Sequence, residues 1–161
     1  MSSGLTFDLS IDPNVRFVST VRRFVEASLE RVLPDPDTLF RVAMTAQELL
    51  ENAGKYCSAG SVQLRFSARL DGVEAIIDLA LINDATPADI CRLSDRIAAI
   101  GAASDPFAHY QKLLREPART RGEPGLGLAR IAAEAEMHLA LEVTGCTVAI
   151  KARTRADLPR T

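Results

Sequence analysis

Three polar side chains stand at helical spacing in the segment QELLENAGKY, residues 47–56: the carboxylate of Glu48, the amide of Asn52 and the amine of Lys55. Steps of four and three residues bring side chains onto one stripe of an α-helix, where they could act on one bound ligand. A solvated helix face is the alternative explanation. Two features favour a functional role over a solvated face. Asparagine is a poor helix-interior residue, and glycine, here Gly54, costs a helix about 1 kcal/mol relative to alanine.

A second candidate site is the glycine-rich turn RGEPGLGLAR, residues 121–130, which contains Gly122, Gly125 and Gly127. These glycines lie just before and inside a predicted helix start. Glycine lets backbone N–H groups approach a ligand, and the partial positive charge of a helix N-terminus suits phosphate. The alternative is that the glycines serve only packing.

A third candidate is the end of a hydrophobic strand in LALINDATPAD, residues 79–89, where Asn83 and Asp84 follow apolar residues. A strand end can present a hydrogen-bond acceptor to a ligand. Polar residues are also an ordinary way for a strand to end, and for this segment taken alone that explanation is favoured.

The elements that position these segments follow from hydrophobic periodicity and turn residues. Alternating apolar and polar residues predict strands, and apolar residues every three or four positions predict helices. Asp35 can cap the helix that carries Glu48, with Pro36 at its first position. The expected elements are a strand at 5–11, a helix that ends before Pro34, a helix at 36–57, a hairpin of 61–70 and 73–82, a helix at 87–100, a short helical piece within 101–124, a helix at 125–137 and a final hairpin.

This order of elements predicts an α+β fold, a two-layer α/β sandwich in which helices cover one face of a mixed sheet. A length of 161 residues predicts a single domain over residues 1–161. The net charge of −2 gives no reason to expect a nucleic-acid partner. The N-terminus lacks a basic-then-apolar signal, and no apolar run is long enough to span a membrane. The three cysteines fit no zinc or disulfide pattern. We therefore expect a cytoplasmic protein without a membrane partner.

Together the three segments resemble the Bergerat ATP-binding fold of the GHKL superfamily, which includes gyrase, Hsp-type chaperones, histidine kinases and MutL. QELLENAGKY is similar to the N box of that family, in which a Glu precedes an Asn by four residues and a Lys follows three later. GEPGLGLARI is similar to its second glycine box, with Pro124 where a small polar residue is common. The order of elements also agrees, so the resemblance covers nearly the whole chain.

The resemblance implies a role for each matching residue. Asn52 would ligate Mg²⁺ through its amide oxygen, Glu48 would accept the proton of an attacking serine hydroxyl or water, and Lys55 would pair with a phosphate. The span 101–121 would be the ATP lid. Backbone N–H groups of the glycine box would hold the remaining phosphates. The residues that would provide these groups are Gly122, Gly125, Leu126, Gly127 and Leu128.

The other glycine box of the family, Asp-x-Gly-x-Gly, would fall on NDATP. Asn83 then stands at the position that reads the adenine amino group, and its side-chain oxygen can still accept that hydrogen bond. Both glycines are replaced, by Ala85 and Pro87. This departure leaves two hypotheses open: a domain that binds ATP and Mg²⁺, or a degenerate, non-catalytic scaffold that acts by binding other proteins.

Within the superfamily the chain looks most like the stand-alone bacterial anti-sigma-factor serine kinases and their ATP-binding relatives. That resemblance implies an ATP-binding regulatory protein, either a serine/threonine protein kinase of the anti-sigma type or a partner switch. It implies a regulatory protein partner, which would be a STAS-type antagonist or a sigma factor, and it allows a homodimer. An ATPase without a protein substrate is the third hypothesis.

Overall fold

The longest helix, α2 (Pro36–Tyr56), begins where the sequence supplies a cap and a first-turn proline. The Asp35 carboxylate accepts a hydrogen bond from the backbone N–H of Thr38 at 3.0 Å and another from the Thr38 hydroxyl. These bonds, the hydroxyl one foremost, lower the pKa of Asp35 because they favour the charged carboxylate. The predicted helix at 36–57 is confirmed.

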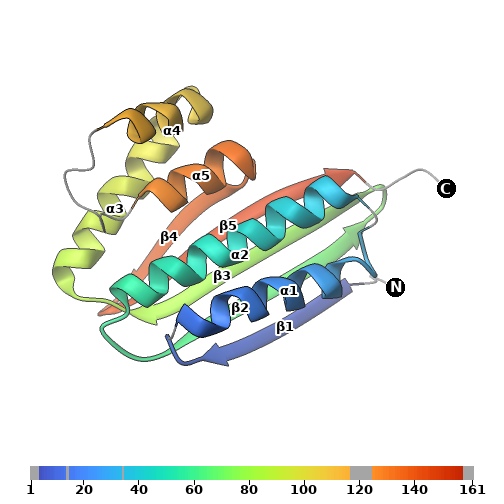
Figure 1. The fold of residues 1–161 in the computed structure, drawn as a ribbon, viewed down its shortest axis with the longest axis horizontal. Coiled ribbons are helices and arrows are strands. Elements are labelled where there is room, and N and C mark those ends of the chain that lie inside the picture. Colours follow the sequence, from blue (N-terminus) through green and yellow to red (C-terminus); the bar gives the residue numbers. More distant parts are fainter. Residues whose placement is uncertain (1–3, 14, 34, 117–124, 158–161) are drawn as a thin grey trace.

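The computed structural model describes residues 4–13, 15–33, 35–116 and 125–157. The remaining elements of those ranges are β1 (Gly4–Ile11), a 3₁₀ turn η1 (Val15–Phe17), α1 (Val18–Leu29), β2 (Ala59–Asp71), β3 (Glu74–Asp84), α3 (Pro87–Ala102), α4 (Pro106–Arg115), α5 (Leu126–Glu134), β4 (His138–Thr144) and β5 (Thr147–Asp157). Figure 1 shows them along the chain.

The five strands form one sheet in the order β1-β2-β3-β5-β4, and every neighbouring pair is antiparallel. The predicted α+β two-layer class is confirmed, but the expected mixed sheet is wrong. Two helices join β1 to β2, so the chain returns in the opposite direction. Strands β3 and β4 do run the same way, yet β5 lies between them and removes the parallel contact.

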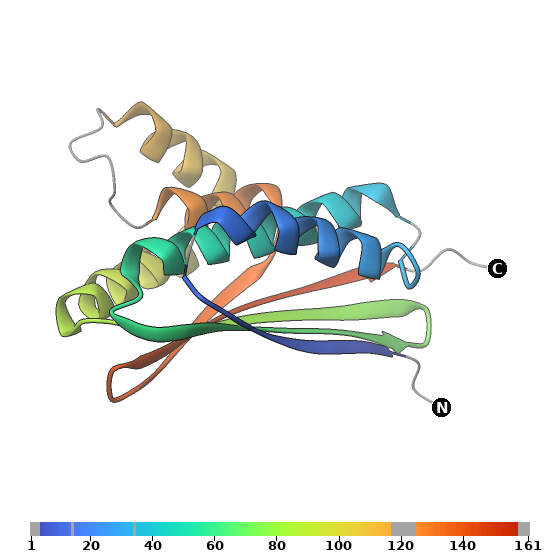
Figure 2. The ribbon, with the colours of Figure 1, turned by 60° about the horizontal axis from the view of Figure 1, so that its bottom comes forward.

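All the described helices lie on one side of the sheet, and α4 lies farthest from it (Figure 2). Helix α2 runs along the middle of the sheet, with α1 on one side and α5 on the other (Figure 1). Strands β2 and β3 alternate buried and more exposed residues, which places one face of each against the helices. The core therefore fills the space between α1, α2, α5 and the sheet.

The short helical piece predicted within 101–124 is confirmed as helix α4, which packs against α5. Asp105 caps α4 by accepting hydrogen bonds from two backbone N–H groups at 3.0 Å each. Tyr110 is buried, and this burial raises the pKa of its phenol. Residues 117–121 of the proposed lid lie outside the described residues. In the part of the chain that the structure describes, no helix has the length and apolar character needed to cross a bilayer.

We expect the core to depend strongly on Phe66, which is 1% exposed and stacks on Phe7 with ring centroids 4.7 Å apart. Phe66→Ala should lower the free energy of unfolding by about 3–5 kcal/mol, because it removes buried surface and leaves a cavity. Urea denaturation measures this loss. The control Phe107→Ala, at a side chain 52% exposed on α4, should change stability by no more than about 0.5 kcal/mol. Equal losses in the two variants would contradict the described core.

Candidate functional site

Glu48 lies on the side of α2 that faces α5, and its side chain is only 13% exposed. Its Oε1 accepts a hydrogen bond from Nη1 of Arg130 at 3.0 Å, which forms an ion pair between the two helices. A solvated helix face would leave this carboxylate in water. That alternative is therefore wrong for Glu48.

Arg130 bonds a second carboxylate, on its own helix. Its Nε donates to Oε2 of Glu134 at 2.6 Å, one helical turn further along α5. The hydrogen bond to Glu134, followed by that to Glu48, raises the pKa of Arg130. Arg130 lies in the glycine-rich segment, but the motifs predicted no role for it. Its spacing of four residues from Glu134 indicates a helical ion pair, but nothing in the sequence indicates the contact with Glu48.

The start of α5 closes directly over Glu48. A Cβ built at Gly127 would lie less than 3.0 Å from Oε2 of Glu48, so only glycine allows this approach without a shift. Gly125 precedes the helix with φ +140°, in the region that favours glycine, and a Cβ there would meet the Arg96 side chain at 2.9 Å. The positive φ of Gly125 favours glycine there, and the structure brings Gly127 against the Glu48 carboxylate.

The structure also brings Asn52 and Asn83 together, because both line one small cavity. Asn83 is 5% exposed and continues the core-facing series of β3 that includes Leu79 and Leu81. Its Nδ2 donates to the backbone carbonyl of Asp84 at 3.0 Å. The other lining residues are Tyr56, Ala85, Asp89, Leu93, Val148 and Ile150.

This cavity is closed in the described conformation. Its volume is only about 10 Å³, which is room for about one water molecule. Leu93 of α3 forms one wall and Ile150 of β5 another. A nucleotide base therefore does not fit here unless the cavity widens.

Other predicted site residues lie apart from this cavity. Lys55 is exposed near the C-terminal end of α2, and the Leu126 side chain is exposed at the start of α5. The Leu128 side chain is buried in the core, so only its backbone could serve a ligand. Gly122 lies outside the described residues.

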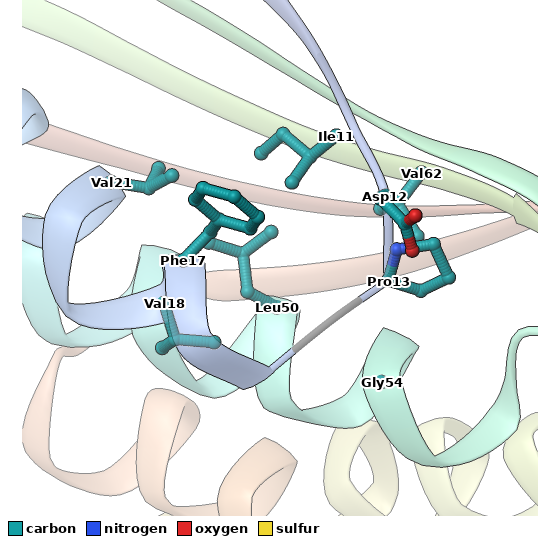
Figure 3. Close-up of a pocket in the computed structure, with 9 residues that line it drawn as sticks. All are labelled: Ile11, Asp12, Pro13, Phe17, Val18, Val21, Leu50, Gly54 and Val62. Carbon is teal, nitrogen blue, oxygen red and sulfur yellow. The ribbon is translucent and has the colours of Figure 1, made fainter.

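Gly54 was one of the two residues that favoured a functional role for the polar face of this helix. In the structure it lines a different cavity. Figure 3 shows this cavity between the end of β1, the start of α1 and α2, and its volume is about 10 Å³. Gly54 lies there beside Leu50, on the α1 side of α2 and away from the Asn52 cavity. Its lining is mainly apolar: Ile11, Pro13, Phe17, Val18, Val21, Leu50 and Val62 with Asp12 and Gly54. The glycine is therefore not evidence for the polar stripe.

Asn52 offers one oxygen ligand for a magnesium ion shared with phosphates. Mg²⁺ keeps several waters and is usually bound through one or two carboxylates together with substrate phosphates. Asn52 is half-buried at the cavity, and its amide carries such an oxygen. Among the described residues no cluster of three or more His, Cys, Asp or Glu could hold a metal by itself, so an ion at Asn52 would depend on a phosphate-bearing ligand.

No known family model matches the chain, and no curated protein matches its sequence significantly. Among solved structures, the fold is similar to a chain in the crystal structure of the SiaB-SiaC complex from Pseudomonas aeruginosa, with a TM-score of 0.63. The match covers 94% of this chain and 89% of that chain, at 17% sequence identity. At this identity the likeness establishes a shared fold and carries no residue roles.

The contact of Gly127 with Glu48 predicts an unusual response to alanine. Gly101→Ala in α3, where a Cβ would have no heavy atom within 4 Å, should stabilise the protein by about 0.4–1 kcal/mol. Gly127→Ala should fall short of this control by about 1 kcal/mol, because the new Cβ displaces the Glu48 carboxylate from Arg130. Thermal and urea unfolding measure both variants.

The same comparison in a Glu48→Ala background tests the cause. With the carboxylate removed, Gly127→Ala should match Gly101→Ala. A shortfall that persists without the carboxylate would contradict the close contact, as would equal stabilisation by both variants in the wild-type background.

Proposed function

We propose that this protein is an ATP-dependent partner-switch regulator that transfers phosphate to a serine or threonine of a regulatory protein. One observation carries the proposal: Glu48 lies against the glycine-rich start of α5, and Asn52, one turn further along α2, lines the cavity that contains Asn83. A carboxylate, an amide and a helix N-terminus are the groups that a phosphoryl-transfer site needs for proton removal, metal binding and phosphate binding.

The fold supports a protein partner for this chain. The similar solved chain belongs to a complex of two proteins, and the match covers nearly all of both chains. By analogy we propose a regulatory protein partner of the STAS type, with a sigma factor as the other class to test.

ATP would supply the phosphoryl group, and the residues of this chain would bind and orient the reactants. Glu48 would accept the hydroxyl proton as the hydroxyl oxygen bonds the γ-phosphorus and the bond to the bridging oxygen breaks, releasing ADP. Asn52 would hold Mg²⁺ through its amide oxygen. N–H groups around Gly125 and Gly127 would bind phosphate oxygens, and Lys55, exposed one turn beyond Asn52, would reach a phosphate from solvent.

Adenine would enter beside Asn83. In the proposed bound state α3 moves outward, Leu93 leaves the cavity and the Asn83 side chain meets the adenine amino group. The proposed lid, residues 101–121, includes α4, which contacts α5 through the buried Tyr110. Only residues 103–105 join α3 to α4, so outward movement of α3 would either shift α4 on α5 or bend this linker.

A second candidate function is a non-catalytic scaffold that acts by binding proteins. The closed cavity of about 10 Å³ favours it, as does Ala85, which is buried where the family carries a glycine. This candidate needs neither nucleotide nor metal. Nucleotide binding therefore separates the two functions.

The proposal predicts that the purified protein binds ATP in the presence of Mg²⁺. Isothermal titration should give heat, and millimolar ATP should raise the melting temperature, because a ligand that binds only the folded state stabilises it. Asn52→Ala should lose the Mg²⁺-dependent part of the binding while its melting temperature without nucleotide stays near that of wild type. Absence of both signals in wild type would favour the scaffold.

A further prediction concerns the proposed base. Glu48→Gln keeps the shape of the side chain but removes its basicity, which should slow transfer of radioactive γ-phosphate to a STAS-type partner by about 10²–10⁴. ATP should bind this variant at least as tightly as wild type. Glu51→Gln is the matched control, because Glu51 lies on the same helix and bonds Gln47 instead of α5. If Glu48→Gln labelled the partner as fast as Glu51→Gln, Glu48 would not be the base.

A further inference from the structure

The Glu48 carboxylate has both oxygens engaged by α5. Oε1 accepts the hydrogen bond from Arg130, while Oε2 lies against Gly127 in the first turn. Gly127 and Arg130 are three residues apart and so lie on the same face of α5. A side chain that is 13% exposed and held in this way is not open to the hydroxyl of a partner protein.

We propose that Arg130 is a positioning residue that holds Glu48 against the first turn of α5, and that this contact must open before a phosphate can occupy that turn. The inference rests on the proposed function, because it concerns the regulation of the same site. It assigns a role to a residue of the glycine-rich segment to which the family resemblance gives none.

The reason is competition between two anions. The N-terminus of a helix attracts negative charge, whether from a carboxylate or from a phosphate. In the described conformation the carboxylate of Glu48 lies at this turn. A phosphate group bound there would be repelled by this carboxylate, so binding of one anion disfavours the other.

Arg130 can release Glu48 without losing its own charge partner. Its Nε already bonds Glu134 at 2.6 Å, whereas Nη1 makes the bond to Glu48 at 3.0 Å. Breaking a half-buried pair is most costly when it leaves a charge without a partner. Because Glu134 remains, the contact between α2 and α5 can open while the guanidinium stays paired.

Opening this contact would have two effects at once. The first turn of α5 would become available to phosphate, and the Glu48 carboxylate would become free to accept a proton. Arg130 would thereby link nucleotide occupancy to the availability of the base, and the carboxylate would stay closed while the site holds no nucleotide.

The test is the affinity of the full chain for ATP with Mg²⁺ by titration calorimetry. Arg130→Gln should bind about fivefold or more tightly than wild type, since the competing carboxylate is no longer held. Glu134→Gln should bind more weakly, because Arg130 then keeps only Glu48 as a partner. Arg130→Lys, which retains the charge but cannot reproduce the two separate bonds of Nε and Nη1, should bind ATP with an affinity between those of wild type and Arg130→Gln. Arg153→Gln, which removes an ion pair with Asp78 on the sheet, is the control for general loss of an arginine.

The expected changes in ATP affinity have the opposite direction to those that the loss of a charge alone would cause. Loss of a nearby cation would by itself weaken ATP binding, and loss of a nearby carboxylate would strengthen it, which is opposite to both expected results. If wild type binds ATP and Arg130→Gln binds equally or more weakly, the positioning role is overturned and the proposed function stands. If only Arg130→Gln binds, the positioning role is supported. If no variant binds, both are overturned.

Discussion

Burial of α2 is the constraint on which the other features depend. The helix runs between α1 and α5 above the sheet, so little of its circumference is left for water. Even Thr45 is fully buried, and its hydroxyl donates to the backbone carbonyl of Arg41 at 2.9 Å. A carboxylate on such a helix needs a charged partner from a neighbouring element, because an unpaired buried charge is costly. Arg130 supplies that partner, and Gly127 supplies the space beside it.

Periodicity in the sequence predicts most of the fold, because each strand and helix buries one face. It also accounts for Asn83, whose place in the alternating series of β3 directs the side chain to the helices. Periodicity does not determine which strands pair across long connections, which is why the insertion of β5 between β3 and β4 was not predicted. The contact between Glu48 and Arg130, 82 residues apart, was missed for the same reason.

The two parts of the candidate site differ in how well their described conformation suits a nucleotide. Around Glu48 and Gly127, the residue types and the close approach of two helices agree with a phosphate-handling site. Around Asn83 the cavity has room for only about one water molecule. The side chain of Ala85 also keeps a ligand farther from the backbone than a glycine would. Under the proposed function, the free energy needed to widen this cavity by moving α3 decides between a nucleotide-dependent switch and a binding scaffold. That quantity depends on packing between α3 and its neighbours, which residue motifs do not encode.

The position of β5 has a consequence for how the protein is made. This strand follows every other described element in the chain, yet it pairs with both β3 and β4 and forms the floor under Asn52 through Val148 and Ile150. During synthesis β1, β2 and β3 emerge before β5, so one edge of β3 stays unpaired until β5 is made. The sheet closes through contacts distant in sequence, which fold slowly. A ribosome-bound chain that lacks β5 would therefore expose an unpaired edge of β3, and such edges are prone to pair with other chains.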